Sequence, residues 1–197
     1  LTTSSPLGSA SGDLDGDGDL DLLLTDTSVN SISIFFNDGT GSFGAATVMV
    51  TGSSPRSMAL GDIDNDGDLD LSYVFTNNVA VCFNNGSGSF TQTAYSVGSS
   101  AKTVVMGDYD KDGDLDLAVS RNNTNPSTIT ILSNSGNGVC SVLTPFNVGN
   151  NLDLFSTADV DGDDDLDLVM PNLSGNDVSV YLNDGSASFT LGTTLTI

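Results

Sequence analysis

The segment from Gly12 to Leu22 reads GDLDGDGDLDL, and three later segments of the chain repeat its pattern. They read GDIDNDGDLDL from Gly61, GDYDKDGDLDL from Gly107 and ADVDGDDDLDL from Ala158. The residue numbers place the first aspartates of the four segments 49, 46 and 51 residues apart. A recurring period of this size indicates tandem repeats, each of which forms one structural unit.

A second landmark keeps the same period. A turn-like sequence follows each acidic segment: FNDGTGSF ending at Phe43, NNGSGSF ending at Phe90, NSGNGV ending at Val139 and NDGSASF ending at Phe189. These ends are spaced 47, 49 and 50 residues apart. Because two independent landmarks recur together, we expect a single domain, 1–197, built from four repeats over residues 5–52, 53–99, 100–149 and 150–197.

Each repeat has the pattern of four short strands joined by tight turns. In the second repeat, strand-forming residues fill 57–60, 71–75, 79–83 and 90–97, and asparagine-rich turn signals separate them. Four antiparallel strands in about 45–50 residues match one propeller blade. We therefore predict an all-β fold, a β-propeller of four blades with four antiparallel strands each. A β-solenoid or a string of small sandwiches is the alternative, although a sandwich domain needs about 100 residues.

The negative charge of the chain is concentrated in the acidic segments. The formal net charge is −22, all 26 acidic residues are aspartate, and 21 of them lie in the four segments. Nucleic acids and anionic membrane surfaces bind cationic footprints, so neither is an expected partner. The chain has no run of about 20 apolar residues, so we expect no membrane-spanning segment. Neighbouring carboxylates repel by about 1 kcal/mol per pair even in water, so the clusters favour bound cations.

Each acidic segment has the form D-x-D-x-D-G-x-x-D, with one change in the fourth, and this form supplies oxygen ligands for Ca²⁺. Numbered from the first aspartate, positions 1, 3 and 5 offer carboxylates, position 7 a backbone carbonyl and position 9 two oxygens. We expect the position-7 carboxylate to point outward. The candidate ligands are Asp13, Asp15, Asp17, Asp19, Asp21, Asp62, Asp64, Asp66, Asp68, Asp70, Asp108, Asp110, Asp112, Asp114, Asp116, Asp159, Asp161, Asp163, Asp165 and Asp167. The sequence predicts about four Ca²⁺ ions, one per blade.

Position 6 of the loop favours glycine, because the chain turns sharply there. The first three loops have Gly18, Gly67 and Gly113 at this position, whereas the fourth has Asp164. We therefore expect the fourth site to be distorted or weaker. Position 12, where an EF-hand has glutamate, is apolar in all four loops: Leu24, Tyr73, Val119 and Met170.

The four D-x-D-x-D loops with their trailing Asp-Leu, together with Gly-Ser-Phe-Gly at 41–44, resemble the FG-GAP/VCBS repeat family. This family occurs in the N-terminal propeller of integrin α-chains and in many bacterial secreted proteins. The resemblance covers nearly the whole chain. It implies that each calcium loop links the first and second strands of a blade, and that rings have seven or eight blades. Four blades are then half of an eight-bladed ring that a homodimer completes; closure of a small four-bladed ring is the alternative.

These features predict an extracellular, calcium-binding propeller that acts as a non-catalytic, lectin-like binding or adhesion module for a protein or carbohydrate ligand. The chain has no histidine or glutamate, the usual groups of general acid–base catalysis, so we do not expect an enzyme. The alternatives are the propeller part of a secreted polysaccharide-degrading enzyme and a self-assembling structural unit. The only cysteines, Cys82 and Cys140, lie in apolar runs; we expect buried free thiols, with a single bridge as the alternative.

Overall fold

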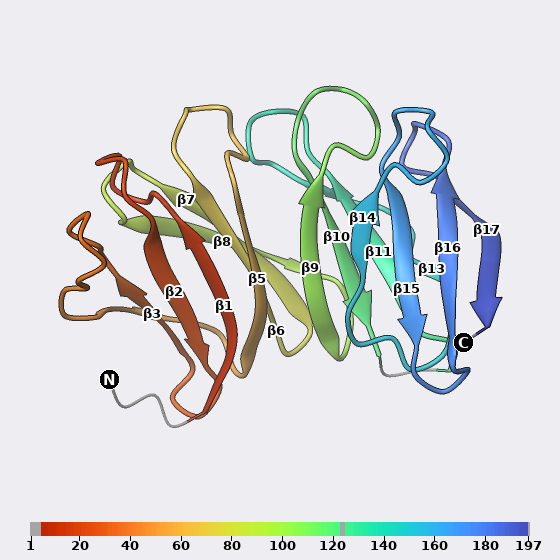
Figure 1. Ribbon diagram of the computed structural model, residues 1–197, viewed down its shortest axis with the longest axis horizontal. Helices are drawn as coiled ribbons and strands as arrows, with labels where there is room; N and C mark the ends of the chain where they lie inside the picture. Colours follow the sequence, from red (N-terminus) through yellow and green to blue (C-terminus); the bar gives the residue numbers. More distant parts are fainter. Residues whose placement is uncertain (1–4, 123–124, 197) are drawn as a thin grey trace.

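The computed structural model describes residues 5–122 and 125–196, and every regular element in these ranges is a β-strand. The strands form four antiparallel sheets that stand in a row, one sheet per repeat (Figure 1). Within these ranges the structure contains no helix with the length and apolar character needed to cross a bilayer. The all-β prediction is therefore confirmed.

Consecutive strands pair within each sheet. The first sheet contains β1 (Pro6–Gly12), β2 (Asp21–Asp26), β3 (Ser31–Phe35) and β4 (Thr47–Val50). The second contains β5 (Pro55–Gly61), β6 (Asp70–Phe75), β7 (Asn78–Asn84) and β8 (Phe90–Ser96). The third contains β9 (Ala101–Gly107), β10 (Asp116–Arg121), β11 (Thr128–Ser133), β12 (Ser141–Val142) and β13 (Phe146–Asn147). The fourth contains β14 (Ser156–Ala158), β15 (Asp167–Asn172), β16 (Asp177–Asn183) and β17 (Phe189–Thr196).

The third sheet departs from four strands because its outermost strand is interrupted. Both β12 and β13 pair with β11, and Pro145 lies between them. Proline has no N–H to donate to a neighbouring strand, so it is tolerated at such an edge but breaks the pairing there. The prediction of four strands per blade holds for the other three sheets.

The hydrophobic core consists of three layers, each between two neighbouring sheets. Strand β7 illustrates the arrangement: Val79 and Val81 pack in the layer shared with the third sheet, whereas Ala80 and Cys82 pack in the layer shared with the first. Successive side chains of a strand point to opposite faces of its sheet. A sheet that is covered on both sides therefore needs apolar residues at nearly every position, which is the pattern seen in the sequence.

The two cysteines are buried free thiols, as expected, and they do not form a bridge. Cys82 lies in the layer between the first and second sheets, whereas Cys140 lies in the layer between the second and third. Burial raises the pKa of Cys82 to about 12 and that of Cys140 to about 11. Both thiols are therefore protonated and unreactive near neutral pH.

The row of sheets is open at both ends. The first and fourth sheets lie at opposite ends of the row (Figure 1). Val160, at position 2 of the fourth loop, is 47% exposed, whereas its counterparts Leu14, Ile63 and Tyr109 are at most 1% exposed because the next sheet covers them. The four sheets thus form an arc of blades rather than a closed four-bladed ring.

Candidate metal centre

The four acidic loops connect the first and second strands of each sheet, as the family resemblance implies. They follow β1, β5, β9 and β14 and lie along one edge of the molecule, the upper edge in Figure 1. Because every first strand enters the row in the same direction, the repeat brings all four loops to this edge. The edge carries most of the negative charge of the chain.

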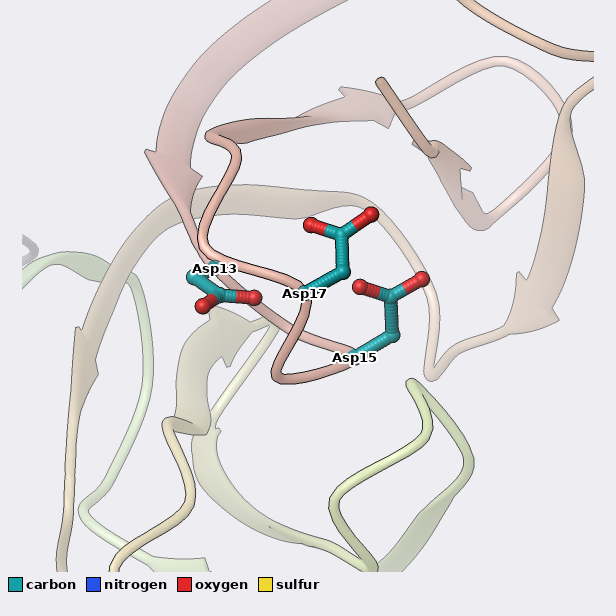
Figure 2. Close-up of side chains that lie close together, drawn as sticks. All are labelled: Asp13, Asp15 and Asp17. Atoms are coloured by element: carbon teal, nitrogen blue, oxygen red, sulfur yellow. The ribbon is translucent and has the colours of Figure 1, made fainter. Parts of the chain in front are cut away.

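Three carboxylates converge in the first loop. Asp13, Asp15 and Asp17 each place an oxygen within 4.8 Å of the others (Figure 2). Oxygens bound to one Ca²⁺ at about 2.3–2.6 Å lie no farther apart than about 5 Å, so this spacing suits a shared ion. Asp62, Asp64 and Asp66 converge in the same way in the second loop. In the third and fourth loops the position-9 aspartate takes the place of position 5 in the cluster: Asp108, Asp110 and Asp116, and Asp159, Asp161 and Asp167.

The position-1 carboxylate organises the backbone of the loop. Asp13 accepts hydrogen bonds from the N–H groups of Gly16 (2.8 Å) and Gly18 (2.9 Å). These residues have φ angles of 76° and 92°, in the left-handed region that directs their N–H groups toward the carboxylate. Asn65 and Lys111, which replace Gly16 in the second and third loops, also have positive φ angles. The loop geometry is thus repeated although its side chains differ.

The fourth loop keeps this geometry despite its aspartate at position 6. Asp164 has a φ of 67°, and its N–H donates to Asp159 Oδ2 at 3.1 Å, as that of Gly18 does to Asp13. The backbone distortion expected from the sequence is therefore absent. The left-handed conformation destabilises a non-glycine residue by about 1–2 kcal/mol, and aspartate tolerates it better than most residues do. The weaker metal binding of the fourth site therefore remains a prediction.

The position-9 aspartates are buried beneath the loops. Each is at most 1% exposed, and each accepts hydrogen bonds from two backbone N–H groups. For Asp116, these come from Tyr109 at position 2 of the loop (3.0 Å) and from Asn134 at the end of β11 (2.8 Å). Burial raises the pKa of Asp116, and that of its counterpart Asp70, to about 6. A nearby cation favours the charged form of such a carboxylate.

A set of asparagines links each loop to its neighbours, and sequence reasoning assigned them only to turns. The Asn134 side-chain amide donates to Leu115 O in its own loop (3.1 Å) and to Ile63 O in the loop of the preceding sheet (2.7 Å). Asn84 and Asn183 make the same contact with the preceding loop, each at 2.8 Å. The signal was present: an asparagine occurs at the start of the second landmark in every repeat, at or just after the end of the third strand.

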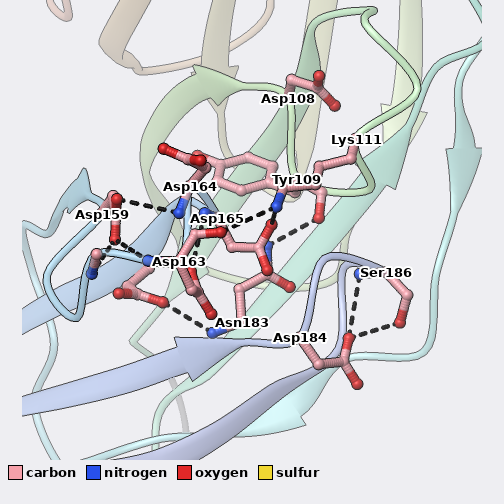
Figure 3. A network of polar contacts seen from close by, with 12 residues as sticks. Asp108, Tyr109, Lys111, Asp159, Asp163, Asp164, Asp165, Asn183, Asp184 and Ser186 are labelled. Atoms are coloured by element: carbon pink, nitrogen blue, oxygen red, sulfur yellow. Dashed lines mark hydrogen bonds and ion pairs between the residues drawn. The ribbon is translucent and has the colours of Figure 1, made fainter.

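The position-7 carboxylates do not point outward, and that expectation was wrong. They are partly or fully buried against the glycines of the neighbouring turns, with Asp19 beside Gly39. Two of them also bind the preceding loop. The Asn65 amide donates to Asp114 (2.7 Å), and Lys111 forms an ion pair with Asp165 (2.5 Å; Figure 3). Asp114 and Asp165 therefore join adjacent loops, and at position 7 the backbone carbonyl remains the candidate ligand.

The position-3 carboxylates have the surroundings expected of cation ligands. The Oδ1 atoms of Asp15, Asp64 and Asp110 are buried and have no hydrogen-bond partner among the described residues. Loss of solvent, followed by repulsion from neighbouring aspartates, raises the pKa of both Asp15 and Asp64. A buried anionic oxygen without a partner is strongly destabilising unless a cation binds it. Hard oxygen donors alone, without nitrogen or sulfur, fit Ca²⁺.

These observations define a segment of a β-propeller with one candidate metal loop per blade. A family model described as an FG-GAP-like repeat matches residues 13–73 and 71–119, more than half of the chain. The chain therefore belongs to the FG-GAP-like repeat family. No curated protein sequence matches it.

Solved propeller structures share the fold at low sequence identity. An Agrocybe aegerita lectin that recognises non-reducing terminal N-acetylglucosamine aligns with a TM-score of 0.65 at 18% identity, over 94% of this chain and 51% of the lectin. A putative 6-phosphogluconolactonase from Bacteroides uniformis aligns with a TM-score of 0.74 at 16% identity, over 98% and 55%. BBS1N, solved in complex with ARL6DN, aligns with a TM-score of 0.69 at 12% identity, over 100% and 60%. The chain thus spans little more than half of each structure, and the propeller prediction is confirmed.

Proposed function

We propose that this chain is a calcium-stabilised, non-catalytic binding module that works outside the cell. The observation that carries the proposal is the recurrence of a carboxylate cluster in every blade. In three of the clusters a buried oxygen has no hydrogen-bond partner among the described residues. In each blade, Ca²⁺ would be held by the aspartates at positions 1, 3, 5 and 9. The ion supplies the positive charge that cancels their repulsion.

The metal loops have a structural role in this proposal, because they are tied to the packing between blades. Asn134 joins its own loop to the preceding one through Leu115 O and Ile63 O. A loop that loses its ion would expose four or five repelling carboxylates beside this contact. Calcium binding would therefore stabilise the interfaces between sheets as well as the loops themselves.

The extracellular location and the ligand class follow from the chemistry of the proposed module. Weak calcium modules with dissociation constants of about 0.1–1 mM are filled outside cells. The ligand would be a protein or a carbohydrate; the same fold carries a lectin, which supports the second class without naming a sugar. The chain lacks histidine and glutamate, which supports a non-catalytic role. Cleavage of a polysaccharide by the purified protein would favour the enzymatic alternative.

Calcium removal tests the proposal directly. We expect the melting temperature in about 1 mM CaCl₂ to fall by about 10 °C or more in excess EDTA, because several sites each contribute binding free energy to the folded state. Added Ca²⁺ should restore the melting curve, whereas Mg²⁺, which needs a smaller octahedral site, should restore it poorly. An unchanged melting temperature in EDTA would falsify the proposal.

We also propose that the chain associates with a second copy through its open ends. Position-8 leucines support this arrangement, since Leu69, Leu115 and Leu166 each lie against a glycine of the preceding sheet. Leu20, their counterpart in the first sheet, is 61% exposed, and Val160 on the free side of the fourth sheet is 47% exposed. The two free faces thus correspond to the two sides of an interface that the chain already forms three times.

A further inference from the structure

A cavity of about 320 Å³ lies where the first strands of the blades meet, away from the metal loops. Strands β1, β5 and β9 lie side by side at the inner side of the arc, and the segment before β14 completes the wall (Figure 1). All four repeats contribute lining residues. The volume falls in the range of about 300–1,000 Å³ that is typical of small-ligand pockets.

Two of the four basic residues of the chain line this cavity. Leu7, Arg56, Lys102 and Asp153 all line it, and each lies six residues before the first aspartate of its repeat. Lys102 approaches Asp153 at 3.7 Å, whereas no ion pair or side-chain hydrogen bond engages Arg56 within the part of the chain that the structure describes. The cavity therefore combines one weakly paired cation with one unpaired guanidinium, which binds carboxylates in a bidentate geometry.

The side chains of Arg56 and Lys102 lie far from the acidic edge. Six residues of extended strand span about 20 Å, so Arg56 and Lys102 lie near the opposite ends of their strands from the aspartate loops. The Debye length at physiological salt is about 8 Å, which largely screens the loops at that distance. One anionic group can therefore bind in the cavity, whereas a polyanion would extend toward the acidic edge.

The rest of the lining favours an apolar group beside the anion. Leu7 (58% exposed) and Leu154 (64% exposed) line the cavity together with Met58. Two of the hydroxyl groups in the wall are already engaged: Thr103 donates to Asp153 O (2.6 Å), and Ser57 Oγ accepts from a backbone N–H (3.4 Å). A sugar ring would find few free polar partners here. An aliphatic side chain would cover the exposed leucines.

We propose that this cavity binds a carboxylate group carried beside an aliphatic side chain, as at the C-terminus of a peptide. Arg56 and Lys102 hold the carboxylate, and Leu7, Met58 and Leu154 contact the side chain. The inference rests on the proposed function as a binding module and names the chemistry of one ligand group. It assigns a site that is separate from the calcium loops.

The test uses N-acetyl-leucine as the probe and N-acetyl-leucinamide, which lacks the charge, as its matched control. Calorimetric titration in calcium buffer should detect binding of the acid and at least about tenfold weaker binding of the amide, because charge-assisted hydrogen bonds are lost. Arg56→Gln should weaken binding of the acid by about tenfold or more, whereas Asp153→Asn should strengthen it by freeing Lys102. Melting curves in calcium should show that both variants remain folded.

Three results would overturn the inference: equal binding of acid and amide, no binding of the acid, or an affinity that Arg56→Gln leaves unchanged. Binding of glucuronate in preference to N-acetyl-leucine would replace the aliphatic acid with a sugar acid and would also reject the proposal as stated. The EDTA melting shift is measured separately. If that shift is present while the probe fails to bind, only the carboxylate site is rejected and the calcium-stabilised module stands.

Discussion

At the scale of single residues, the asparagines that begin each turn hold the metal loops in place. Asn84, Asn134 and Asn183 use one amide group to reach a carbonyl in the preceding loop, and their backbone N–H groups bind a position-9 carboxylate. Because each asparagine has both a side-chain amide and a backbone N–H, it can contact the neighbouring blade and its own loop at the same time. The packing between two blades is therefore coupled to the candidate metal loops of both.

We expect the substitution Asn134→Ala to weaken the contact between neighbouring loops. The substitution keeps the backbone hydrogen bond to Asp116 but removes the partners of Ile63 O and Leu115 O, so we expect a loss of about 2–3 kcal/mol in the free energy of unfolding. Urea unfolding in saturating calcium measures the change. The calcium affinity of the variant should also fall.

The chain offers a matched control in Asn37. Among the described residues its side-chain amide donates to Leu20 O alone (3.2 Å), because no other described sheet lies on that side of the first. Asn37→Ala should therefore cost only about 1 kcal/mol. Equal losses for the Asn37 and Asn134 variants would show that the contact between loops contributes nothing, and the coupling would be rejected.

At the scale of the element, the metal loop depends on backbone conformation as much as on its carboxylates. Positions 4 and 6 have positive φ angles in all four loops. Nothing lies within 4 Å of a side-chain carbon built at Gly18, Gly67 or Gly113, so the space exists for a larger residue and only the conformation opposes one. This explains how Asp164 fits the fourth loop without moving it.

We expect the substitution Asp164→Gly to stabilise the fourth loop. Glycine removes the strain of the left-handed aspartate but adds freedom to the unfolded chain, so we expect a net gain of about 0.5–1 kcal/mol in the calcium-bound protein. The reverse change in the second loop, Gly67→Asp, should destabilise by a similar amount. Urea unfolding and calcium titration measure both. A destabilising Asp164→Gly would mean that the position-6 carboxylate of the fourth loop helps to bind the metal.

The elements differ in how far the sequence predicted them. The repeat period and the short strand-forming runs between turn signals predicted the four sheets, because these depend on local pattern. The interruption at Pro145 was missed, although proline in an edge strand is a local signal. The inward position of the Asp19 side chain and the amide contact of Asn134 depend on neighbouring turns and sheets. Contacts of this kind arise only from packing, so periodicity could not predict them.

At the scale of the whole molecule, the two strand ends carry different chemistry. The acidic loops occupy one edge, whereas Arg56, Lys102 and Arg121 lie near the opposite ends of β5, β9 and β10. The repeat produces this separation, because every blade turns its loop to the same side. The proposed cation sites and the proposed carboxylate site therefore lie at opposite ends of the strands.

The open ends of the arc lead to the whole-molecule prediction. Head-to-tail contacts that use one interface repeatedly close into rings when the rotation allows it. The exposed Leu20 and Val160 belong to the two halves of such an interface, and burying each apolar face against another copy would remove it from water. We therefore expect light scattering at low micromolar concentration in calcium to give twice the chain mass of 20.1 kDa.

Two substitutions make this measurement specific. Val160→Asp places a charge in the free face of the fourth sheet and should return the protein to the 20.1 kDa monomer, because an unpaired carboxylate is costly to bury. Val29→Asp is the control: Val29 is 63% exposed in the turn between β2 and β3, outside both faces, so the dimer should persist. A monomer for the unsubstituted protein at every concentration, or a dimer that Val160→Asp leaves intact, would reject closure through these faces.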